Sequence, residues 1–167
     1  MPVTDRDKGY SRRVKAILTA GSSPTVTYVG VLGDKASAAH KESGLTVGDL
    51  AEIHEFGLGV PERSFLRAWF DAERDSILIA LRAAHRQVLL GKLTPQQAGN
   101  LIGLRFVGQI QKWIADNKVQ PPSSDETNAR KGSSVTLIDT GQLRAAISYL
   151  VETRLISGPA LGSARSG

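Results

Sequence analysis

The spacing of apolar residues along this 167-residue chain predicts several amphipathic helices. The first spans residues 4–20, and four apolar side chains share one of its faces: Tyr10, Val14, Ile17 and Leu18. The opposite face is basic, with Arg12, Arg13 and Lys15. A basic helix face can bind phosphate, although a solvated surface is the simpler interpretation.

The longest helical patterns lie in the middle of the chain. Residues 62–90 predict either one long helix or two helices in sequence, closed by Gly91. The next helix begins at the sequence TPQQ, where Thr94 is expected to cap the N-terminus and Gln97 to complete a capping box. Pro95 suits the first helical position because no N–H is needed there.

This second long helix is expected to run to about Asp116. An apolar ridge along it predicts its buried face, at Ile102, Phe106, Ile110 and Ile114. Three glycines weaken the same helix by up to about 1 kcal/mol each relative to alanine. We therefore expect another helix or backbone, from this chain or a neighbouring subunit, to approach closely at Gly99, Gly103 and Gly108.

Two stretches favour strands. Residues 25–33, TVTYVGVLG, are rich in β-branched side chains, and residues 148–157, SYLVETRLIS, alternate so that one face is wetter than the other. Between them, residues 34–44 predict a loop, and residues 45–56 a short helix closed by Gly57. The predicted fold class is α+β: a small antiparallel sheet packed against two long helices, with a long internal loop and extended termini.

These patterns divide the chain into three parts. We expect a helical arm at residues 1–20, a single α+β domain at residues 21–156 and a flexible C-terminal tail at residues 157–167. The domain contains a long loop at residues 117–138 that begins with two prolines and has few apolar residues. Ordering such a loop costs about 1–2 kcal/mol of backbone entropy per residue, so we expect other subunits or partner proteins to order it.

The composition changes this picture little. The net charge of +5 and the pI of 9.7 permit a role near nucleic acid without arguing for one, because 21 Lys and Arg residues are scattered among 16 acidic residues. The chain has no cysteine, which excludes disulfides and thiolate chemistry. No apolar run approaches the ~20 residues of a membrane span and no signal-peptide core is visible, so we expect a soluble protein made in the cytoplasm.

The pair His54-Glu55 is how a zinc-metalloprotease motif begins, but the motif is not completed. Its second His is needed four residues after the first, and that position is Leu58. His40 and His85 have no neighbouring His or Cys, and no phosphate-binding glycine loop or nucleophile motif is present. The sequence predicts no metal, no cofactor and no catalytic residue, so we expect a structural or interaction protein.

The sequence IDTGQL, which starts at Ile138, predicts a short helix that runs through Ile147. The Asp139 carboxylate, or else the Thr140 hydroxyl, is expected to cap this helix by accepting from the exposed amides of its first turn. Gln142 is placed to reach back in a capping box. We therefore expect Asp139 to be structural, with no nucleophilic or acid–base role.

Two sets of short motifs carry a family resemblance that covers roughly residues 25–155. The first set is A-x-I-x-E-F-G at residues 51–57, followed by V-P-x-R-x-F-L-R-x-x-F-D at residues 60–71. The second set lies between residues 110 and 149 and comprises I-x-x-x-I, P-P-x-S-x-x-T, K-G and L-I-D-T-G-Q-L-R-x-x-I-x-Y. In this order the motifs resemble the neck and tail-completion proteins of tailed double-stranded DNA bacteriophages, some of which are labelled minor tail or virion morphogenesis proteins.

The resemblance implies a structural virion protein of the neck or tail, made in the cytoplasm of the host bacterium and without catalysis. Members of such families form homo-oligomeric rings, commonly of six subunits, that join the head connector to the tail. The implied partners are further copies of the chain and the adjoining portal-side and tail-tube proteins, with no membrane. DNA passes through the ring without sequence-specific binding. Tail terminator, head-closure stopper and tail-completion roles all stay open.

The resemblance also suggests which residues make subunit or partner contacts: Glu55, Arg63, Arg67, Pro121, Pro122, Arg130 and Lys131. On this interpretation, Glu55, Arg63 and Arg67 pair across subunit boundaries, and the alternative is that they are solvated surface charges. A different class of function also stays open. The basic balance and the basic helix face fit a nucleic-acid-binding accessory protein.

Overall fold

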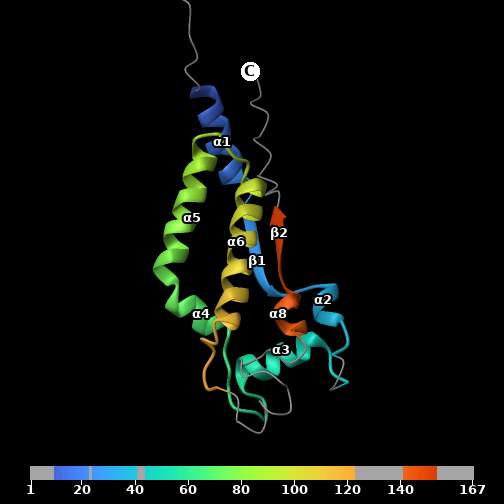
Figure 1. The fold of residues 1–167 in the computed structure, drawn as a ribbon. Coiled ribbons are helices and arrows are strands. Elements are labelled where there is room, and N and C mark those ends of the chain that lie inside the picture. The colour runs from blue at the N-terminus through green and yellow to red at the C-terminus, as the bar shows by residue number, and fades with distance from the viewer. Residues whose placement is uncertain (1–9, 23, 41–43, 123–140, 154–167) are drawn as a thin grey trace, which may run out of the picture.

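The structure, a computed structural model, describes residues 10–22, 24–40, 44–122 and 141–153 (Figure 1). It has the mixed α+β fold that the sequence predicts. Its elements follow in the order α1 (Tyr10–Ser22), β1 (Thr25–Val31), α2 (Asp34–Ser37), α3 (Val47–Phe56), α4 (Leu66–Ala72), α5 (Arg74–Leu89), α6 (Pro95–Ala115), α8 (Gln142–Ala146) and β2 (Ile147–Thr153).

The two predicted strands are confirmed and pair with each other. β1 and β2 run antiparallel, with Thr25 opposite Thr153 at one end and Val31 opposite Ile147 at the other. The hydroxyl oxygens of Thr25 and Thr153 lie 3.2 Å apart. Side chains of β1 alternate between a half-buried face and an exposed face, which is the pattern of a sheet that is covered on one side.

Helix α6 crosses one face of both strands and forms the centre of the core. The predicted capping box is confirmed, because Thr94 Oγ1 accepts from the Gln97 amide at 3.1 Å and Gln97 Oε1 accepts from the Thr94 amide at 2.9 Å. Pro95 takes the first helical position. The predicted ridge is also confirmed, since all four of its side chains are buried: Ile102, Phe106, Ile110 and Ile114.

Two of the three glycines of α6 allow β2 to lie directly on the helix. A Cβ at Gly103 would lie 2.4 Å from Cδ2 of Tyr149, and a Cβ at Gly99 would lie 2.8 Å from Cγ1 of Val151. The predicted close approach is confirmed at these positions, and it comes from the same chain. At Gly108 no described atom beyond the helix's own turn lies within 4 Å of the position of a Cβ, so close approach by a neighbouring subunit stays a prediction there.

Residues 62–90 contain two helices, since α4 ends at Ala72, α5 begins at Arg74, and Glu73 is the cap residue between them. Helix α5 packs chiefly on α6, and its buried side chains form a single stripe: Ile77, Ala80, Ala84 and Val88. Helix α6 covers both strands, whereas α5 lies beside α6 (Figure 1).

Helices α2, α3 and α8 gather at the end of the molecule opposite α1 (Figure 1). Helix α3 begins with a capping box that the sequence analysis missed, between Thr46 and Asp49. It ends at Gly57, as predicted, with a left-handed backbone at φ 68°. Helix α2 falls within residues 34–44, which were predicted as a loop.

The helix predicted from Asp139 begins later than expected. Helix α8 starts at Gln142, and its N-cap is Gly141, with a left-handed backbone at φ 73° and no side-chain cap hydrogen bond. Gln142 is thus the first residue of α8, and the expected reach of its side chain back towards residues 139 and 140 stays a prediction, because those residues lie outside the described part of the chain. Asp139 itself lies outside the described residues, so its capping role stays a prediction.

The start of the predicted loop at residues 117–138 belongs to the core. Val119 is fully buried, and it holds the segment after α6 against its own chain. Pro121 and Pro122 follow and are exposed. Residues 123–138, including Arg130 and Lys131, lie outside the described residues, so the ordering of this segment by other subunits stays a prediction.

Candidate functional site

The Glu55 carboxylate ties the end of α3 to the start of α4. Glu55 is only 5% exposed. Its Oε2 accepts from the backbone amides of Phe65 at 2.8 Å and Leu66 at 3.0 Å, and its Oε1 accepts from the amide of Arg67 at 2.9 Å. The Ser64 hydroxyl donates to Oε1 at 2.8 Å. These amides lie at the positive end of α4, where a carboxylate is favoured.

Two opposing effects set the pKa of Glu55. Burial raises the pKa, and it is the largest single effect. The hydrogen bonds from the Leu66, Arg67 and Phe65 amides and from the Ser64 hydroxyl together outweigh burial, so the pKa of Glu55 lies below its ordinary value. The carboxylate is therefore charged at neutral pH and accepts hydrogen bonds from these donors.

The Arg67 side chain lies over the same junction. Its Nε is 3.2 Å from Glu55 Oε1, and its Nη2 is 2.9 Å from Glu62 Oε1 and also donates to the Glu55 carbonyl oxygen. The guanidinium carbon lies 4.9 Å from the centre of the Phe56 ring, a cation–π contact. Arg67 thus closes residues 55–62 onto the start of α4.

Arg63 connects two parts of the chain that are far apart in the sequence. Its Nε donates to the Pro121 carbonyl oxygen at 3.2 Å, across 58 residues of sequence. Its backbone amide donates to the His54 carbonyl at 2.8 Å. The structure therefore brings four of the predicted contact residues into one region, Glu55, Arg63, Arg67 and Pro121, at the end of the molecule away from α1.

In place of pairs across a subunit boundary, the structure gives Glu55 and Arg67 partners in their own chain. Glu55 is not the solvated surface charge of the alternative interpretation, because it is buried. Arg67 keeps a half-exposed side chain and Arg63 is partly buried. The four residues form a framework that holds the α3–α4 connection, and their role in partner contacts stays a prediction.

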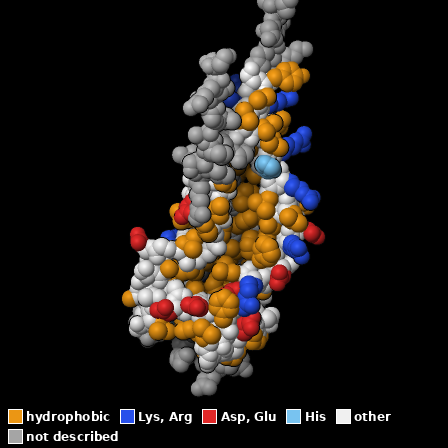
Figure 2. All heavy atoms as spheres, turned by 180° about the vertical axis from the view of Figure 1, so that it is seen from behind, with side chains coloured by type: hydrophobic (Ala, Val, Ile, Leu, Met, Phe, Trp, Pro, Cys, Tyr) orange, Lys and Arg blue, Asp and Glu red, His pale blue; other side chains and the backbone are white. Residues whose placement is uncertain are grey.

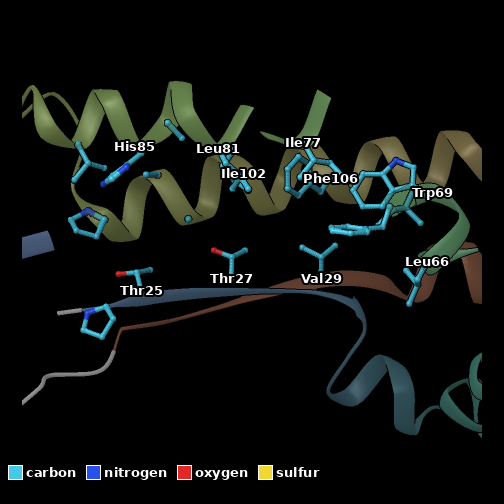
Figure 3. Close-up of a pocket in the computed structure, with 18 of the residues that line it drawn as sticks. Thr25, Thr27, Val29, Leu66, Trp69, Ile77, Leu81, His85, Ile102 and Phe106 are labelled. Atoms are coloured by element: carbon cyan, nitrogen blue, oxygen red, sulfur yellow. The ribbon is translucent and has the colours of Figure 1, made fainter. Parts of the chain in front are cut away.

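A groove with a volume of about 880 Å³ runs along β1 and α5, with α6 as its floor (Figure 3). Figure 2 shows hydrophobic side chains gathered along this hollow. The two walls of this α5–β1 groove face each other, with Thr25, Thr27 and Val29 on β1 and Ile77, Leu81 and His85 on α5. Trp69 lies at one end and meets Phe106 edge to face, with 5.5 Å between ring centres.

The α5–β1 groove follows from a mismatch between helices and strands. Neighbouring strands lie about 4.8 Å apart and packed helices about 8–10 Å apart, so one helix covers about two strands. Helix α6 already covers β1 and β2, and the sheet of the described residues has only these two strands. Helix α5 therefore extends beyond the edge of β1, with no described strand beneath it.

A second apolar surface lies on α1, at the far end of the molecule from α3 (Figure 1). Three side chains at helical spacing, which we call the α1 stripe, are strongly exposed: Tyr10 at 64%, Val14 at 55% and Ile17 at 52%. Apolar side chains in a row on one helix face normally pack against another element. The stripe and the groove are thus two exposed apolar surfaces on one chain.

Sequence reasoning missed the groove but contained a signal for it. The spacing of Leu81, Ala84 and Val88 predicts one buried helix face. Ala84 and Val88 are buried, whereas Leu81 is 43% exposed in the groove. The available signal was the number of elements, because two long helices over two predicted strands leave one helix without a sheet to cover.

Among the described residues, no three His, Cys, Asp or Glu side chains are grouped as a metal site requires. No helix in that part of the chain is long and apolar enough to cross a membrane. Comparisons with protein-family models, with curated proteins and with solved structures find no match to this chain.

Proposed function

We propose that this chain is a structural subunit of the neck or tail of a tailed bacteriophage. It forms a homo-oligomeric ring, commonly of six subunits in such families, that joins the head connector to the tail and lets DNA pass. The observation that carries the proposal is the open α5–β1 groove of about 880 Å³. Large exposed apolar surfaces mark contacts with other proteins, as an assembly subunit requires.

The motifs that carry the family resemblance support the same proposal. Glu55 of the E-F-G motif accepts from Phe65 and Arg67 of the F-L-R motif. Arg63 donates to Pro121 of the P-P motif. Residues that are far apart in the sequence thus hold one connection in place. Rigid loops on a small body suit a subunit that must meet identical neighbours and two different partner proteins.

A nucleic-acid-binding accessory protein is the second candidate, and one observation favours it. Arg12, Arg13 and Lys15 are all exposed on α1, so their charges are available to phosphates. A gel mobility shift with duplex DNA at low salt tests this candidate. Retarded DNA whose retardation declines steeply with added salt supports it, and unshifted DNA at micromolar protein rules it out.

The neck or tail proposal is tested with particles assembled without this chain. A host that carries the phage genome with this gene disrupted is induced, and the lysate is imaged by negative stain. We expect heads and tails that fail to join, or tails of abnormal length, with normal particles restored by the intact gene in trans. Normal, infectious particles from the disrupted genome would contradict the proposal.

A further inference from the structure

The α1 stripe and the α5–β1 groove match in chemistry and in length. Helix α1 has 13 residues, which at about 1.5 Å per residue span roughly 20 Å. The groove follows β1, whose seven residues span roughly 23 Å. Both surfaces are mainly apolar, one on a helix and the other in a hollow. A helix of this length therefore fits the groove from end to end.

Helix α1 is stabilised when its apolar face packs against another element. An isolated helix of 13 residues is marginal in water, so its stability depends on packing. Within the chain, α1 packs against α5. Arg12 of α1 lies against Gly91, in the turn that follows α5. A Cβ at Gly91 would lie 2.8 Å from Cγ of Arg12. This contact uses a residue of the basic face and leaves the α1 stripe more than half exposed.

The position of α1 separates it from the groove of its own chain. Helix α1 ends at Ser22, and the groove begins with Pro24 and Thr25. From there α1 runs away from β1 (Figure 1), whereas the groove follows β1 in the opposite direction. In this arrangement the stripe is presented outward, and the groove of the same chain stays open.

We propose that the α1 stripe of one copy docks in the α5–β1 groove of a second copy. This inference rests on the proposed function in one respect, that the chain forms a homo-oligomer. Because the stripe and the groove are different surfaces, the contact is heterologous, and every copy donates one helix and receives one. Heterologous contacts form a ring where the rotation between copies closes, and otherwise a filament.

The absence of cysteine allows a direct test by cross-linking. Val14→Cys and Leu81→Cys are made in separate copies, mixed, and treated with a short bismaleimide. Leu150→Cys replaces Leu81→Cys in the control, because Leu150 lies on the opposite face of the sheet and is 50% exposed against 43% for Leu81. We expect the position 14–81 product to exceed the 14–150 product at least about tenfold, since docking holds the groups at millimolar effective concentration.

A chain with both Val14→Cys and Leu81→Cys separates docking between copies from docking within one copy. Products of two or more chains support the inference. A cross-linked single chain shows that α1 folds back into its own groove, and it overturns the inference. Equal 14–81 and 14–150 products reveal random collision and overturn it as well. In assembled particles, a position 81 product with a chain of different sequence shows that another protein occupies the groove, and it overturns the inference.

Charge substitutions give a second test through the mass of the complex. Each of Ile17→Asp and Leu81→Asp is expected to abolish self-association when present alone, and both positions are exposed enough to keep the fold. Mixed together, the two variants are expected to form a one-to-one dimer and nothing larger, because only one intact stripe and one intact groove remain. Analytical ultracentrifugation measures both results.

The outcomes also separate this inference from the proposed function. If both charge variants form oligomers of the same mass as the wild-type protein, the docking of α1 is overturned. A ring built on other surfaces then stays possible. Wild-type protein that neither associates nor cross-links between positions 14 and 81 overturns the inference too. The morphology of particles made without the chain judges the neck or tail role independently of either result.

Discussion

Gly103 of α6 lies against the ring of Tyr149 in β2, so closely that a methyl group at position 103 would lie 2.4 Å from Cδ2 and 3.0 Å from Cβ of Tyr149. The Cβ contact matters because rotating the ring does not remove it. The helix and the sheet are therefore in direct contact at this glycine, and the separation of the two layers depends on it.

Gly103→Ala is expected to destabilise the protein by about 1–3 kcal/mol, because the added methyl forces α6 and β2 apart. Gly108→Ala is the matched control in the same helix, and no described atom beyond its own turn lies within 4 Å of its Cβ position. It is expected to stabilise by about 0.5–1 kcal/mol through helix propensity. Urea unfolding measures both, and the same sign for the two would contradict this packing.

Glu55→Gln is expected to lower the free energy of unfolding by about 2–3 kcal/mol. The amide of glutamine keeps one acceptor oxygen but places an NH2 group against backbone donors that need an acceptor. Glu62→Gln is the control, since Glu62 also pairs with Arg67 but has a side chain that is 57% exposed. Its expected effect is below about 1 kcal/mol, as for other surface ion pairs. Equal losses for the two variants would show that Glu55 is not the centre of the junction.

The dependence of stability on pH follows from the lowered pKa of Glu55. Above the ordinary value of 4.5 the stabilisation is fully present, because the carboxylate is charged in both the folded and the unfolded chain. As the pH falls through 4.5 towards the folded pKa, the unfolded chain binds the proton first, and the stabilisation is lost.

The urea midpoint of the wild-type protein should therefore fall more steeply below about pH 4.5 than that of Glu55→Gln. Asp49, whose pKa is lowered by hydrogen bonds from Thr46, titrates in both proteins and cancels from the comparison. Parallel pH profiles for the two proteins would mean that Glu55 has the same pKa in the folded and unfolded states.

Gly57 and Gly59 form a second matched pair, in the connection after α3. Both have left-handed backbones, at φ 68° and φ 77°, but only Gly57 is crowded, with its Cβ position 2.9 Å from Cβ of Glu62. Gly59→Ala is expected to cost about 1 kcal/mol from backbone strain alone, and Gly57→Ala about 1 kcal/mol or more beyond that. Thermal unfolding of both variants tests the difference. Equal losses of stability would contradict the close contact between position 57 and Glu62.

The elements that the sequence predicts correctly have local causes. Thr94 and Gln97 are three residues apart, and their capping box needs no other part of the chain. The buried ridge from Ile102 to Ile114 follows from helical spacing alone. The close approach at Gly103 could be predicted for the same reason, because a glycine within a helix is unfavourable unless something lies against it.

The candidate site could not be predicted in the same way, because its contacts are not local. The burial of Glu55 depends on the return of the chain at Phe65, and the partner of Arg63 is 58 residues away in sequence. The position of a charged residue in the sequence fits a solvent-exposed group and an interface group equally well. Gly108 marks a similar limit, since its sequence context matches that of Gly103 while its surroundings do not.

The groove was missed because it results from the arrangement of elements and not from any one of them. Leu81 has the spacing of a core residue, and only the position of α5 beyond the edge of β1 leaves it exposed. The α1 stripe was visible as a pattern from Tyr10 to Ile17, but the pattern cannot say whether its cover lies in the same chain.

The central claim, that this chain is part of the joint between head and tail, is tested most directly by locating it in mature particles. An antibody against the chain, carrying gold, is applied to intact phage and imaged by electron microscopy. The account predicts label at the junction of head and tail, and none on particles made without the gene. Label along the tail tube or at its distal tip, or no label on disrupted particles that expose the junction, would contradict it.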